Sequence, residues 1–181
     1  MARRIVPILI LIILGIAFRT IWHIGPNVEF VTAATFLATY YFGKKASVIV
    51  PLAVMAISDT LIGNTNIFVF TWSAYILIGL LDYRVIGRLD RQNIVIVQTL
   101  MGIFASLFFF LWTNFGVWIS DSFHMYPTTW VGLINCYFAG LPFLKLNLAG
   151  NLFFISVSFS VVEAIKKTAL RKKPSWFFVP S

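Results

Sequence analysis

Long apolar segments with few charged residues recur along this chain, and they constrain its fold more than any other feature. One of them, residues 94–112, contains no Asp, Glu, Lys or Arg. Apolar segments of this length, without alternating polar residues, are typical of helices that span a membrane. Of the 181 residues, 60% are hydrophobic and 11% are charged, whereas a soluble domain carries about 25% charged residues. The sequence therefore predicts an all-α integral membrane protein with a single transmembrane domain, residues 1–181.

Polar and proline-containing breaks divide the chain into six predicted transmembrane helices. We expect these helices at about residues 5–22, 28–42, 46–62, 67–83, 94–112 and 146–164. Residues 128–141 are apolar but too short for a full span. They predict an extra interfacial or re-entrant helix before the last span, and the sequence leaves both forms open.

The basic residues indicate how these helices are oriented. Twelve of the 14 Lys and Arg residues fall on one side of the six-helix arrangement. They are Arg3, Arg4, Lys44, Lys45, Arg84, Arg88, Arg91, Lys166, Lys167, Arg171, Lys172 and Lys173. Basic residues are enriched in cytoplasmic loops, so we expect the N and C termini in the cytoplasm. Because topology accounts for the net charge of +8, we expect the lipid bilayer and not nucleic acid as a partner.

Polar residues gather on the opposite side of the predicted membrane. Residues 26–63 read as two apolar helices joined by the turn Gly43-Lys44-Lys45, and such a hairpin places Glu29 and Asp59 at similar depth. Placing an acidic residue in or near an apolar span costs free energy, so its presence indicates a functional site. With tryptophans at the same level, these groups predict one outward-facing pocket for a small-molecule substrate. The candidate ligand-binding residues are His23, Asn27, Glu29, Asp59, Asn64, Trp72, Trp112, Asn114, Asn135, Asn147 and Asn151.

Each candidate also has an ordinary structural interpretation. Tryptophans at helix ends form interfacial belts, and Asn residues in loops form turns and caps. Asn147 and Asn151 can join helices, and Arg19 can extend its side chain to the outer interface. The chain has one cysteine and no phosphate-binding glycine loop, HExxH or GxSxG motif. We therefore expect no metal, no cofactor and no catalytic residue.

Three motifs resemble a known family. The hairpin from Pro26 that ends Ser58-Asp59-x-x-x-Gly63 resembles the substrate-binding (S) components of energy-coupling factor (ECF) transporters. Gly140-Leu141-Pro142-Phe143 and Asn147-x-x-Gly150-Asn151 resemble a small, uncharacterised group of bacterial membrane proteins related to those components. The resemblance implies a six-helix, multi-pass, non-enzymatic protein of the bacterial cytoplasmic membrane. Such a protein captures a vitamin or another small micronutrient from outside.

The resemblance also implies a partner and roles for residues. S components dock on a transmembrane coupling subunit that two ATPases drive, often through an Ala-x-x-x-Ala pair in the first helix. In this chain the corresponding pair, Ala34 and Ala38, falls in the second predicted helix. We expect Glu29, Asp59, Asn114, Asn147 and Asn151 to hold polar groups of the ligand, with Trp72 and Trp112 stacking on it.

Two other functions stay open from the sequence. A membrane scaffold or accessory subunit could bind another membrane protein through the aromatic segment 113–145. A small enzyme acting on lipid could use Asp59, His23 or His124 as acid and base, which requires a histidine and a carboxylate within reach of each other.

Overall fold

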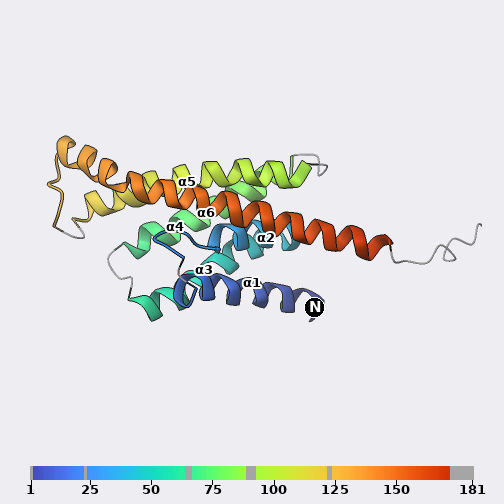
Figure 1. Cartoon of the computed structure of the whole chain (residues 1–181). Helices are drawn as coiled ribbons and strands as arrows, with labels where there is room; N and C mark the ends of the chain where they lie inside the picture. The colour runs from blue at the N-terminus through green and yellow to red at the C-terminus, as the bar shows by residue number, and fades with distance from the viewer. Residues whose placement is uncertain (1, 23, 64–66, 89–92, 122–123, 172–181) are drawn as a thin grey trace, which may run out of the picture.

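Six helices make up the part of the chain that the computed structural model describes, which is residues 2–22, 24–63, 67–88, 93–121 and 124–171. They are α1 (Ala2–Thr20), α2 (Val31–Phe42), α3 (Lys44–Ile62), α4 (Phe68–Ile86), α5 (Ile94–Ile119) and α6 (Trp130–Arg171). Figure 1 shows them running roughly antiparallel along one long axis. The helices α3, α4, α5 and α6 are long and apolar enough to cross a membrane. The chain is therefore a multi-pass membrane protein.

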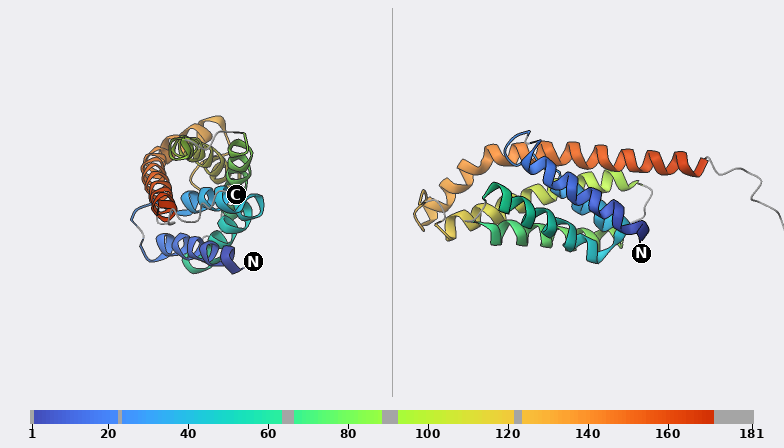
Figure 2. Two further views of the ribbon diagram at one scale, coloured as in Figure 1. Left: turned by 90° about the vertical axis from the view of Figure 1, so that its right-hand side faces the viewer. Right: turned by 90° about the horizontal axis from the view of Figure 1, so that it is seen from below.

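The shortest helix, α2, lies at the centre of the bundle. It packs against each of the other five helices, and the end-on view in Figure 2 shows it surrounded by them. All nine residues from Val31 to Thr39 are buried. The hydroxyl groups of Thr35 and Thr39 donate to the carbonyl oxygens of Val31 and Thr35, at 2.8 Å and 2.7 Å. Since the helix satisfies these polar groups itself, it can be buried on every side.

A single residue, Gly43, separates α2 from α3. Its φ angle of 85° lies in the left-handed region, where glycine has no side chain to clash. The two lysines predicted for this turn instead begin α3. The predicted hairpin of residues 26–63 is thus confirmed, although α2 begins at Val31 rather than near residue 28.

Close packing of α3 and α4 depends on Gly79. A Cβ atom at this position would overlap the carbonyl oxygen of Ser47 in α3 and would also press on the Thr35 side chain. The absence of a side chain at Gly79 therefore lets α4 approach the backbone of α3, as small residues do in membrane helix pairs.

The last part of the chain differs most from the predicted helices. α5 continues to Ile119, seven residues beyond the predicted end at Trp112. Thr113 and Asn114 donate from their side chains to carbonyl oxygens one turn earlier, at 2.8 Å each. These polar residues are thus accommodated inside the helix, and they do not begin a loop.

The extra helix predicted at residues 128–141 is not a separate element. It is the first part of α6, which runs for 42 residues through Pro142. Figure 2 shows that α6 bends and then extends beyond the other helices toward its C-terminal end. Proline removes one backbone hydrogen bond and bends a helix without necessarily ending it. The prediction of two helices was wrong because it ended one helix at residue 141, before Pro142, and began the next near Leu146.

Three of the basic residues predicted on one side of the membrane, Lys44, Arg84 and Lys166, lie at one end of the bundle (Figure 1). Lys44 and Arg84 line one common cavity, and the Lys166 ammonium lies 3.9 Å from the centre of the Tyr41 ring near the end of α2. The C-terminal ends of α1, α3 and α5 lie toward the other end (Figure 1). The predicted separation of basic and polar ends is therefore present in the fold.

Candidate functional site

The side chain of Arg19 is the centre of a buried polar network at the loop end of the bundle. Arg19 lies in the last turn of α1 and is 7% exposed. Its Nη1 atom donates to Ser58 Oγ at 2.6 Å and to Asp59 Oδ1 at 2.8 Å, and it lies 3.0 Å from the sulfur of Met55. The predicted alternative, in which Arg19 extends to the outer interface, is thus wrong. The guanidinium turns inward because α3 presents a carboxylate to it.

A second carboxylate, from Glu29, contacts the same guanidinium. Glu29 Oε1 lies 3.1 Å from Arg19 Nε, an ion pair without hydrogen-bond alignment. Its Oε2 atom accepts from the Tyr75 hydroxyl group at 3.5 Å. Since Arg19 contacts both Glu29 and Asp59, the prediction that these two acids lie at similar depth is confirmed.

The indole group of Trp72 completes the network from α4. Its Nε1 atom donates to Asp59 Oδ2 at 2.7 Å, so the two carboxylate oxygens of Asp59 have separate partners. Removing a carboxylate from water costs several kcal/mol unless such partners are present. Asp59 is therefore held from both sides and is 5% exposed.

A cavity of about 650 Å³ opens beside this network. Its size falls in the range of small-molecule sites, about 300–1,000 Å³. The lining comes from the loop before α2, from α1, α3, α4, α5 and α6, and from the segment before α6. The lining residues are Arg19, Pro26, Asn27, Glu29, Met55, Ile67, Thr71, Tyr75, Phe109, Thr113, Asn114, Val117, Met125, Tyr126, Cys136, Ala139, Gly140 and Phe143.

Three of the predicted ligand-binding residues line this cavity: Asn27, Glu29 and Asn114. Asn27 has a φ angle of 60°, a left-handed conformation that Asn tolerates better than most residues. Two further predicted residues, Asp59 and Trp72, are not in the cavity lining: Asp59 accepts from Arg19, and Trp72 donates to Asp59. A cavity is thus present at the end of the bundle where the pocket was predicted, with a smaller polar lining than the sequence suggested.

Two predicted residues on α6, Asn147 and Asn151, join helices instead of lining the cavity. Asn147 Nδ2 donates to the carbonyl oxygen of Asn27 at 3.1 Å. Asn151 Nδ2 donates to Ser106 Oγ at 2.8 Å and to Asn147 Oδ1 at 3.1 Å. The chain of hydrogen bonds links α5, α6 and the loop before α2. It therefore fixes the backbone that presents Asn27 to the cavity.

The remaining predicted residues lie elsewhere. Trp112 Nε1 donates to Ser73 Oγ at 2.9 Å, away from the cavity lining. Asn135 is on the exposed side of α6. His23 and Asn64 lie outside the described residues.

The two alanines predicted to dock on a partner are inside the bundle. Ala34 and Ala38 are both 0% exposed and belong to the main hydrophobic core. A partner subunit could reach them only if the helices around α2 separated.

The sequence prediction missed two residues of the site, Arg19 and Tyr75. The signal for Arg19 was present, because it is one of two basic residues predicted on the side that carries Glu29 and Asp59. Tyr75 gave no such signal, since it lies within an apolar helix and only the fold directs its hydroxyl group toward Glu29.

One family model matches nearly the whole chain. The model of DUF6580, a family of unknown function, covers residues 1–175. The chain belongs to DUF6580. The comparison with curated proteins and the comparison with solved structures each gave no match.

The DUF6580 chain also places one histidine beside a carboxylate, outside the cavity lining. His124 Nδ1 lies 2.8 Å from Asp121 Oδ2 in the segment before α6, and 87% of the His124 side chain is exposed. Within the described ranges, no three His, Cys, Asp or Glu side chains come close enough together to hold a metal ion.

Proposed function

We propose that this protein is a membrane-embedded capture subunit that binds a small molecule in the cavity beside Arg19. The observation that carries this proposal is the cavity of about 650 Å³, which combines aromatic walls with the partly exposed carboxylate of Glu29. The ligand is a vitamin or another micronutrient in this proposal, as in the ECF S components that the sequence resembles. A transmembrane coupling subunit with two ATPases would complete the uptake system.

The charges of the network favour a ligand that carries positive charge. Arg19 contacts both Asp59, at 2.8 Å, and Glu29, at 3.1 Å, so one cation faces two carboxylates, and Glu29 is the one that lines the cavity. The Glu29 side chain is 17% exposed, compared with 4% for Asp59. A cationic group in the cavity would offset the charge of Glu29, and the rings of Tyr75 and Phe109 would add cation–π attraction.

The proposed protein lies in a bacterial cytoplasmic membrane with both termini in the cytoplasm. The gathering of basic residues at one end supports this orientation. α1 contributes an apolar stretch from Ile5 to Thr20, and α2 has 12 residues, about 18 Å of helix. We propose that both helices complete a six-helix transmembrane domain, with α2 shielded from lipid by the other five.

The orientation can be tested with single cysteines in a Cys136→Ser background. A membrane-impermeant maleimide added to intact cells should label Met125→Cys before lysis. It should label Lys45→Cys only after lysis. The reverse pattern would contradict the orientation.

Ligand binding is tested by native mass spectrometry of the protein purified in mild detergent from its own host. We expect a bound adduct of a few hundred daltons that is lost in Glu29→Gln and in Ala139→Trp, which fills the cavity. Glu163→Gln is the matched control, because Glu163 bonds to Tyr41 at the opposite end. ATPase subunits in the same spectrum would support the proposed association with a coupling subunit and two ATPases.

Two results would contradict the capture function. The first is a wild-type chain that carries no adduct. The second is an adduct that both cavity variants retain as fully as the control. Purification with a single unrelated membrane protein and no ligand would instead favour the scaffold function.

A further inference from the structure

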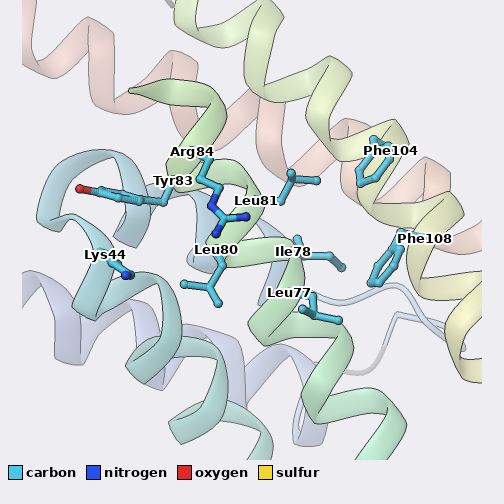
Figure 3. Close-up of a pocket in the computed structure, with 9 residues that line it drawn as sticks. All are labelled: Lys44, Leu77, Ile78, Leu80, Leu81, Tyr83, Arg84, Phe104 and Phe108. Atoms are coloured by element: carbon cyan, nitrogen blue, oxygen red, sulfur yellow. The ribbon is translucent and has the colours of Figure 1, made fainter. Parts of the chain in front are cut away.

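A second cavity lies at the basic end of the bundle, between α4 and α5 beside the start of α3. Its volume is about 440 Å³, and it is remote from the Arg19 network. Figure 3 shows Lys44 and Arg84 beside a row of aliphatic and aromatic side chains. The cavity therefore joins a cationic end to an apolar floor.

The two cations come from different helices. Lys44 begins α3, and Arg84 lies in the last turn of α4. Both residues are exposed, and neither forms an ion pair with any residue that the structure describes. They are therefore available to an anionic group from outside the chain.

The apolar floor runs along the helices away from these cations. Leu77, Leu81 and Arg84 follow one another at spacings of four and three residues, so they share one face of α4. The distance from Arg84 to Leu77 along the helix is about 10 Å. On α5, the rings of Phe104 and Phe108 stack with centroids 6.2 Å apart and planes 10° apart. The floor is thus an elongated apolar strip, suited to a hydrocarbon chain.

This strip opens on the outer surface of a membrane helix. Leu77 is 45% exposed and Phe104 is 46% exposed, although both lie in helices that are apolar enough to cross a membrane. In such a helix an exposed apolar side chain faces lipid. The cations lie where a lipid headgroup would be, because the basic end marks one membrane surface.

We infer that this cavity binds an anionic phospholipid, with its phosphate between Lys44 and Arg84 and one acyl chain along α4 and α5. Basic pockets between membrane helices are suited to such headgroups, because each nearby Lys or Arg adds about 1 kcal/mol of attraction. A zwitterionic phosphatidylcholine headgroup carries no net charge and gains less. This inference is independent of the ligand proposed for the cavity beside Arg19.

The test compares lipid binding by native mass spectrometry after titration with phosphatidylglycerol or with phosphatidylcholine of the same acyl chains. We expect tighter binding of phosphatidylglycerol by the wild-type protein. The double variant Lys44→Gln/Arg84→Gln should lose about 10-fold to 30-fold of that affinity. Lys45→Gln/Arg88→Gln is the control, because it removes the same charge from exposed neighbours outside the cavity.

A third variant tests the apolar floor. Leu77→Trp fills the strip without changing the charge, and it should weaken phosphatidylglycerol binding while the protein stays monodisperse on size exclusion. Equal losses in the two double variants would overturn the inference, since they would indicate general attraction to the basic end. Equal affinity for the two lipids would also overturn it, as would full displacement of the lipid by inorganic phosphate.

Discussion

Arg19 Nη1 lies 2.8 Å from Asp59 Oδ1, and this ion pair joins the last turn of α1 to the last turn of α3. Both side chains are almost fully buried, with 6% and 4% of their surface exposed. A buried ion pair is weak support for stability when intact, but breaking it leaves one charge without a partner. The pair therefore links α1 to α3 at the end of the bundle where the candidate ligand site lies.

Replacing Arg19 with leucine should strongly destabilise the protein. The change leaves the carboxylates of Glu29 and Asp59 without their shared cation, at a cost of about 3–5 kcal/mol. For a chain of this size we expect the melting midpoint in detergent to fall by about 10 °C or more. Lys145→Leu is the control, because Lys145 is exposed and on the same side. Similar midpoints for the two variants would contradict the importance of the network.

The partners of two tryptophans predict different costs for the same substitution. Trp72→Phe removes a hydrogen bond to the carboxylate of Asp59, and Trp112→Phe removes one to the hydroxyl of Ser73. Hydrogen bonds to charged groups contribute about 1.5–3 kcal/mol, and those between neutral groups about 0.5–1.5 kcal/mol. We therefore expect the larger loss of thermal stability in Trp72→Phe. A larger loss in Trp112→Phe would show that Asp59 does not depend on the indole.

The contact between Asn151 and Ser106 should couple α6 to α5. Asn151→Ala removes the bonds to Ser106 and Asn147, and we expect a loss of about 1–2 kcal/mol. In a double-mutant cycle, Ser106→Ala should cost less in the Asn151→Ala background than in the wild-type protein. Melting midpoints of the four proteins in one detergent measure this coupling. Strictly additive effects would mean that the two side chains act independently.

Gly79 in α4 and Gly87, the residue directly after α4, should respond differently to alanine. Gly79→Ala should destabilise the protein, because the new methyl group would overlap the Ser47 carbonyl oxygen. Gly87→Ala should be neutral or slightly stabilising, since Gly87 has an ordinary φ of −62° and only van der Waals neighbours. Thermal midpoints distinguish the two. If Gly79→Ala melts at or above the wild-type temperature, α3 and α4 do not pack as closely as described.

The sequence by itself determined the class of fold and the separation of its two ends. Apolar length predicts helices in a membrane because backbone groups in lipid must bond within their own helix. This reasoning located all six helices and placed Glu29 and Asp59 at one depth. It misjudged α6, because a proline such as Pro142 can bend a helix without ending it, and this helix continues from Trp130 to Arg171.

Only the tertiary structure decided which polar residues face the cavity. Asn147 and Asn151 are polar side chains four residues apart on one helix face, a pattern that also suits ligand binding. Their hydrogen bonds nevertheless go to Asn27 and Ser106. Arg19 turns inward because α3 and the loop before α2 bring two carboxylates to it, and these lie 40 and 10 residues away. The hydropathy of a segment shows that burying a charge there costs free energy. Which partner offsets that cost depends on contacts between helices, which the sequence of any one helix does not contain.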